Sequence, residues 1–382
     1  MGSETKFQHL AALAGLSLVI LVRWWSYLCS VEPLNDESIY LQAFQAVAAG
    51  RSPDSVGGFY YPATFAALGG WLIETLGEPA TRWLLKLLSI LGLASTMWVS
   101  LSLWEAPWGR RFLVAAAYLS LSPAVLYGIE TGNISFAVIG SVLVALAIWS
   151  AQPWPAGILL GSSSAIKPLA PLAILALLFH RPVPATRRHL FAGVAAAAVA
   201  AMILLSDPEY LGTSAQAMDR LPFIRSFSLN RILLLMNLEV SPVVVAAGLG
   251  ALICLVARLC PMDRKTLICY GGLAAVLAVP IIWSHTLLLT LPLQVLALTR
   301  AVSRHRQRQD RATGENEDWR TTCRRYELIF VILAVVALQF TEGLGAIDDQ
   351  AVLFQIVILS GAYLAAPALM SYVLITKSNS IP

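Results

Sequence analysis

Charged residues are scarce in this chain, at 13% of 382 residues, whereas soluble domains contain about 25%. Hydrophobic residues make up 58%. This balance excludes an ordinary soluble enzyme and predicts an all-α, polytopic membrane protein. Because no long polar linker interrupts the apolar stretches, we expect a single integrated membrane domain over residues 1–382.

The sequence also lacks the motifs of metal sites, disulfide frameworks, nucleotide-binding folds and cleaved signal peptides. The five cysteines show no metal-ligand spacing with histidines, which predicts small apolar fillers and no disulfide framework. The chain contains no G-x-G-x-x-G or Walker-type loop, so we expect no nucleotide-binding fold. The start, MGSETKFQHL, leads into an apolar stretch without a small-residue cleavage site, which predicts an uncleaved first span. We expect no cofactor and no metal.

A spanning helix needs about 20 apolar residues. The hydropathy pattern predicts about 12 spans, some of them short. They are 9–27, 83–103, 112–128, 134–150, 156–166, 168–180, 190–206, 243–258, 266–280, 285–299, 326–341 and 350–374. The stretch 156–180 is broken at Lys167-Pro168, because proline disfavours helix at the residue before it.

Arginine and lysine gather in alternate loops. The positive-inside rule places these loops in the cytoplasm: Arg110-Arg111, Arg181–Arg188, Arg258–Lys265 and Arg300–Arg325. The pattern predicts a multi-pass protein of the plasma (inner) membrane with both termini cytoplasmic. The last loop holds eight arginines, and we interpret it as a tether that meets anionic lipid headgroups, not nucleic acid.

The segment from Asn35 to Pro62 is the one long polar stretch in the first hundred residues. Asn35 suits an N-cap, with Asp36 and Glu37 in the first turn, and Gly50 can end the helix. Apolar residues recur on one helical face, which predicts a short amphipathic helix on the membrane surface. The apolar stretch 62–76 is short for a span and predicts a second surface helix.

This topology puts a set of polar and aromatic groups on the extracytoplasmic side. Polar residues at membrane depth are unfavourable and point to function. The set comprises Asp36, Glu37, Tyr60, Tyr61, Glu130, Asn133, Lys167, Arg225, Asn230, Arg231 and His285.

Charge suggests chemical roles for three of these residues. Asp36 is a candidate general base for a hydroxyl nucleophile; alternatively, Asp36 and Glu37 only favour the positive end of their helix. Lys167 is a candidate phosphate ligand, and the competing interpretation is a cation that snorkels to the interface. His285 suits orientation of a sugar or phosphate or proton transfer, or it bonds within the bundle.

The remaining residues are candidates for contacts with phosphate, sugar and acceptor. Arg225 and Arg231 are further phosphate candidates, although loop arginines are common. Glu130, Asn133 and Asn230 suit hydroxyl binding, and helix capping is the alternative for Asn133. Tyr60 and Tyr61 suit stacking on sugar rings or anchoring at the interface.

Several motifs in this order resemble those of glycosyltransferase family 87, within the GT-C superfamily of membrane glycosyltransferases. The resemblance covers about residues 10–300. Ala63 stands where a second proline is usual in the Tyr-Pro-Pro element. The motifs are NDESIYLQAFQAVAAGR, FYYPATFAALGGWL, GIETGNISF and AGILLGSSSAIKPLAPL, and more loosely SFSLNR and PIIWSHTLLLTLP.

The resemblance implies a polyprenyl-phosphate-linked sugar donor, with mannose the family's expected sugar, and a lipid- or glycan-linked acceptor hydroxyl. It implies inversion, with Asp36 as general base and with Lys167, His285 and the two arginines on the departing phosphate. It also implies a GT-C-like core at 1–206 with a catalytic loop at 31–62, followed by variable helices at 207–382.

A transporter or flippase of lipid-linked sugars is the alternative, and a non-catalytic membrane scaffold is a third hypothesis. A transporter should show helix breaks in matching positions of two halves. The sequence shows one clear break, at Lys167-Pro168. A scaffold explains the spans but not the one-sided polar set.

Overall fold

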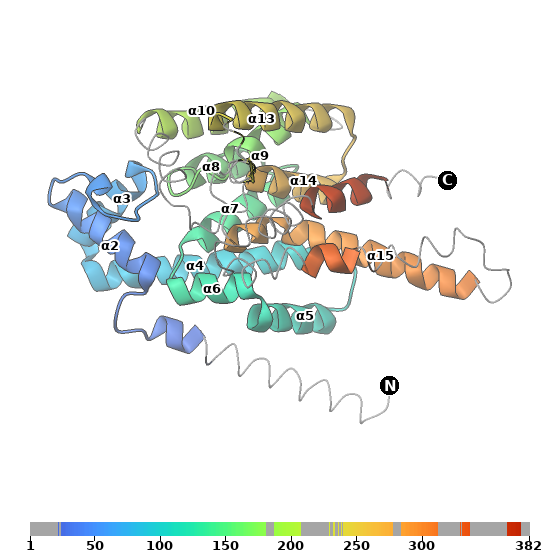
Figure 1. The fold of residues 1–382 in the computed structure, drawn as a ribbon, viewed down its shortest axis with the longest axis horizontal. Coiled ribbons are helices and arrows are strands. Elements are labelled where there is room, and N and C mark those ends of the chain that lie inside the picture. Colours follow the sequence, from blue (N-terminus) through green and yellow to red (C-terminus); the bar gives the residue numbers. More distant parts are fainter. Residues whose placement is uncertain are drawn as a thin grey trace.

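The structure is a computed structural model. It describes residues 22, 24–180, 187–207, 229, 232–233, 236, 238, 240–277, 284–311, 329, 331–336 and 365–375. Within these ranges every regular element is a helix, so the all-α prediction is confirmed. Figure 1 shows the main bundle, with α2 and α3 together at one end.

The main helices follow one another along the chain. In order they are α2 (Asn35–Ala48), η1 (Pro53–Ser55), α3 (Ala63–Leu76), α4 (Glu78–Ser102), α5 (Trp108–Leu121), α6 (Pro123–Thr131), α7 (Ser135–Ile148), α8 (Pro153–Ser163), α9 (Pro171–Phe179), α10 (Arg187–Leu205), α13 (Pro242–Leu259), α14 (Arg264–Leu277), η2 (Ser284–Thr290) and α15 (Leu291–Arg311).

Three helical stretches in the described residues are long and apolar enough to cross a membrane: Glu78–Ser102, Arg187–Leu205 and Thr286–Arg304. The pair α5 and α6 qualifies as a fourth only when its two members are taken together, because they are bent by 58°. Several shorter apolar helices accompany them. These helices support a membrane protein, while the count of about 12 spans stays a prediction.

The predicted span at 112–128 is not one continuous helix. The chain leaves the helical conformation at Ser122, with φ −68° and ψ 117°, and Pro123 begins α6. Proline disfavours helix at the residue before it and suits the first turn of a new one. The same chemistry at Lys167-Pro168 was predicted correctly, since α8 ends at Ser163 and α9 begins at Pro171.

The two short helices predicted in and after the polar segment are confirmed as α2 and α3. The predicted cap is wrong by one residue: Leu34 is the N-cap, and its N–H donates to Glu37 Oε2 at 3.0 Å. Gly50 follows α2 with φ +71°, a conformation that glycine adopts readily. Phe44 of α2 is buried against Phe65 of α3, with ring centroids 5.1 Å apart.

The centre of the bundle is α7, which is buried along almost its whole length and packs against α4. Small residues make this crossing close. A Cβ atom added at Gly92 of α4 would overlap the backbone of Phe136 and Ala137, and one added at Gly140 of α7 would overlap Gly92. Small residues let helix backbones approach in membrane proteins.

We predict that Gly92→Leu destabilises the protein, because the side chain has no room between α4 and α7. Overpacking a closely packed core destabilises by about 1–3 kcal/mol. The measurement is thermal unfolding in detergent. Gly248→Leu on α13 is the matched control, since a Cβ there meets nothing within 4 Å. Equal melting temperatures for the two variants would contradict the close crossing.

Candidate active site

Asp36 lies in the first turn of α2 and is hydrogen-bonded to the turn between α6 and α7. Its Oδ2 accepts a hydrogen bond from Asn133 Nδ2 at 2.6 Å. The approach depends on Gly132, which has φ +73° and ends α6. A Cβ on Gly132 would lie 3.1 Å from the Cβ atoms of both Leu34 and Glu37. Glycine therefore suits this position by conformation and by space.

Asn133 is held in one orientation by its own backbone surroundings. Its Oδ1 accepts from the Ser135 N–H at 2.9 Å, and its N–H donates to Gly128 O at 2.9 Å. The residue is only 5% exposed. Because Oδ1 is occupied by a donor, the amide nitrogen is the atom turned to Asp36.

Lys167 continues this chain of contacts from the break between α8 and α9. Its Nζ donates to Ser135 Oγ at 2.9 Å and lies 5.7 Å from the centre of the Tyr61 ring. The residue is 7% exposed. Four of the predicted site residues, Asp36, Asn133, Lys167 and Tyr61, are therefore brought to one place from four separate segments.

The surroundings of the Asp36 carboxyl change its pKa in opposing directions. Burial raises its pKa above the ordinary value, while the hydrogen bond from Asn133 and the positive charge of Lys167 act in the opposite direction. A carboxylate with a raised pKa is a better proton acceptor than an exposed one. This environment suits a general base.

Aromatic side chains form the wall beside Lys167. The hydroxyls of Tyr61 and Tyr40 are 2.7 Å apart, and both rings contact Phe65 edge-on or tilted. Tyr60 is partly buried next to Tyr61 in the chain. This wall fixes the Tyr61 ring beside Lys167.

Two hydrogen bonds tie the start of α3 to distant helices. Thr64 Oγ1 donates to Ala165 O at 3.0 Å, in the turn that carries Lys167. The Ala63 N–H donates to Asp207 Oδ2 at 2.6 Å, and Asp207 follows the end of α10. The Tyr61-Pro62 corner is therefore held against both of these segments.

Glu37 and Glu130 lie apart from the Asp36 contacts. Glu37 is 2% exposed, and its Oε1 is 3.4 Å from Arg82 Nε and 3.9 Å from Lys86 Nζ of α4. Glu130 is exposed at the end of α6 and lines a separate pocket of about 350 Å³ together with Leu34. Neither carboxylate joins the chain of contacts from Asp36 to Lys167.

The other predicted residues are not described at the side-chain level. Arg225, Asn230 and Arg231 lie outside the described residues. His285 belongs to η2, whose backbone is described but whose side chain at this position is not. Since η2 packs against α6 and α7, it lies beside the two helices that flank Asn133.

Several residues of the site were not predicted. Ser135 and Tyr40 each bond a predicted residue, and Asp207 bonds the backbone of α3. Arg82 and Lys86 pair with Glu37. Two cations four residues apart at the start of an apolar helix were a usable signal, since such residues share one helical face. Ser135, Tyr40 and Asp207 each stand alone in the sequence, and no pattern there marks them as site residues.

Comparisons with known proteins identify the family. A search of curated proteins and a search of solved structures both found no match. The sequence profile of glycosyltransferase family 87 matches residues 59–280, more than half of the chain. The match includes the Tyr61-Pro62 corner, the Asn133 turn and the Lys167 break, so the predicted resemblance is confirmed. This chain belongs to glycosyltransferase family 87.

Proposed function

We propose that the protein transfers a sugar, with mannose the first candidate, from a polyprenyl-phosphate-linked donor to a hydroxyl of a lipid- or glycan-linked acceptor. We place the reaction on the extracytoplasmic side of the plasma membrane, with inversion at the anomeric carbon. Family membership supports a glycosyltransferase with a donor and an acceptor. The observation that carries the proposal is the chain of contacts from Asp36 through Asn133 and Ser135 to Lys167.

Asp36 acts as general base in this proposal. The acceptor oxygen forms a bond to the anomeric carbon while the bond from that carbon to the phosphate oxygen breaks. The acceptor proton moves to the Asp36 carboxylate, and the electron pair leaves with polyprenyl phosphate. The hydrogen bond from Asn133 Nδ2 engages Oδ2, and in this proposal the acceptor hydroxyl approaches the other carboxylate oxygen.

Lys167 supplies positive charge for the departing phosphate. An ammonium carries three N–H donors, and the Ser135 hydroxyl takes one of them. Negative charge grows on the leaving group in the transition state, and a fixed cation in a buried site stabilises it more than water does. The Tyr61 ring beside Lys167 is our candidate for stacking on the sugar.

Most of the remaining predicted residues keep the roles proposed for them from the sequence. His285, Arg225 and Arg231 are candidates for further contacts with phosphate, and Tyr60 and Asn230 for contacts with sugar or acceptor. Glu130 is a candidate for the acceptor side, because it lines a pocket next to Leu34 at the start of α2. The ion pairs of Glu37 favour a structural role for that carboxylate.

We predict that Asp36→Asn lowers the rate of sugar transfer by about 10²–10⁴-fold, because general-base catalysis contributes roughly that much. The assay is release of polyprenyl phosphate from a polyprenyl-phosphate sugar by purified protein in detergent. Detergent has no two sides, so a transporter or flippase gives no signal. Asp54→Asn is the matched control, since Asp54 is exposed and contacts Ser52 nearby in the chain. Unchanged turnover by a folded Asp36→Asn variant would remove Asp36 as base.

We predict that Asn133→Ala moves the acidic limb of the pH–rate profile to higher pH. The amide donates to the charged form of Asp36 and so lowers its pKa; without this bond the pKa rises. Activity then fails at a higher pH as the solution is acidified, because a protonated carboxyl cannot accept the proton. The measurement is kcat/KM against pH for both proteins. A limb that stays in place or moves to lower pH would argue against this pairing.

We predict that Lys167→Met weakens binding of the donor by about tenfold or more and leaves acceptor binding nearly unchanged. A hydrogen bond to a charged group contributes about 1.5–3 kcal/mol. The measurement is separate titration with donor and with acceptor. Lys265→Met, which removes an exposed lysine paired with Glu105, is the control. Equal losses for both substrates would overturn the phosphate role of Lys167.

A further inference from the structure

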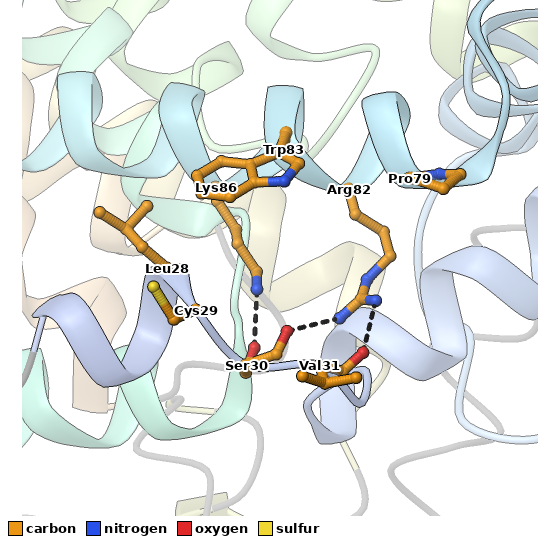
Figure 2. Close-up of a pocket in the computed structure, with 8 residues that line it drawn as sticks. All are labelled: Leu28, Cys29, Ser30, Val31, Pro79, Arg82, Trp83 and Lys86. Carbon is orange, nitrogen blue, oxygen red and sulfur yellow. Dashed lines mark hydrogen bonds between the residues drawn. The ribbon is translucent and has the colours of Figure 1, made fainter.

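A second cationic site lies beside Glu37, at the start of α4. It is a pocket of about 250 Å³ between the start of α4 and the segment that leads into α2, shown in Figure 2. Arg82 and Lys86 reach across it from α4 toward Ser30 and Val31. Lys167 is not among the residues that line it.

The pocket carries more positive than negative charge among the described residues. Arg82 and Lys86 share one carboxylate, that of Glu37, at 3.4 and 3.9 Å. The side chains are 16% exposed for Arg82 and 4% exposed for Lys86. A charge out of water is unfavourable unless it is paired, so two cations with one anion favour a further anion. The nearby N-terminus of α4 adds to the positive potential.

Neutral acceptors hold these cations in place without cancelling their charge. Arg82 donates to Val31 O at 2.9 Å and to Ser30 O at 3.3 Å, and Lys86 donates to Ser30 Oγ at 2.7 Å. Both heads are therefore fixed at the pocket before any ligand arrives. Such a prepared arginine and lysine pair suits a phosphate group, which accepts several hydrogen bonds.

The pocket opens onto an apolar stripe of α4. Trp83 lines the pocket and is 54% exposed. Leu87 and Leu91 follow at intervals of four residues, with 51% and 53% exposure, and residues four apart lie on the same helical face. Since α4 is long and apolar enough to span a membrane, this stripe suits contact with a lipid chain.

We propose that this pocket binds the phosphate of an anionic membrane phospholipid, with a chain of that lipid along the stripe of Trp83, Leu87 and Leu91. The headgroup completes the charge balance of Arg82, Lys86 and Glu37. It acts as a bound partner and takes no part in sugar transfer. Glu37 is next to Asp36 in α2 and pairs with Arg82 and Lys86. A lipid bound to these two cations therefore also stabilises the helix that carries Asp36.

The test is a thermal-shift titration of the purified protein in detergent with phosphatidylglycerol, phosphatidylcholine and soluble glycerol 3-phosphate. A ligand that binds the folded state raises the melting temperature as its concentration rises. We expect stabilisation by phosphatidylglycerol alone at matched concentrations. Lys86→Gln should weaken its apparent affinity by about tenfold, and Lys265→Gln should leave it unchanged.

A second variant tests the apolar part of the site and leaves its charged residues in place. Trp83→Ala keeps both cations and Glu37, and it should weaken phosphatidylglycerol binding because it shortens the apolar wall. Equal stabilisation by the two phospholipids, or full affinity in both Lys86→Gln and Trp83→Ala, would overturn the proposal. Equal stabilisation by glycerol 3-phosphate would also overturn it, in favour of a site for soluble phosphate. These readouts do not require sugar transfer, so they stand apart from the fate of the catalytic proposal.

Discussion

The hydrogen bond between Asp36 and Asn133 connects the two parts of this protein on which function depends. Asp36 belongs to α2, which packs with α3 at one end of the bundle. Asn133 belongs to the turn between α6 and the buried α7. One short bond therefore places the candidate base against the rigid centre of the molecule. The hydrogen bonds of Asn133 to Ser135 and Gly128 hold its amide in place, so the position of the Asp36 carboxylate depends on this centre.

Two neighbouring carboxylates at the start of α2 contact different groups. Asp36 faces Asn133 and interacts with Lys167, whereas Glu37 faces Arg82 and Lys86. Successive residues on an α-helix point about 100° apart, so one turn can serve two different cationic environments. The catalytic proposal uses the first and the phospholipid proposal uses the second. The packing of α4 and α7 around Gly92 and Gly140 keeps the two environments in a fixed relation.

Much of the local structure could be predicted because its causes are local. The acidic first turn, Gly50 and the apolar face were enough to predict α2, and Lys167-Pro168 was enough to predict the break before α9. The N-cap was misplaced by one residue because a backbone N–H of Leu34 bonds Glu37, a pattern in which the capping group is the third residue of the helix. The bend at Ser122-Pro123 was missed because hydropathy stays high across it.

The sequence by itself determined an all-helical membrane protein, a carboxylate at the head of a short helix, a lysine at a helix break and the family to which they belong. Those features follow from composition, proline chemistry and motif order. Only the tertiary structure decided that Asn133 and Ser135 join Asp36 to Lys167, that Glu37 pairs with α4, and that Asp207 binds α3. These contacts join residues far apart in the chain, and which faces of the helices meet depends on the packing of all of them together.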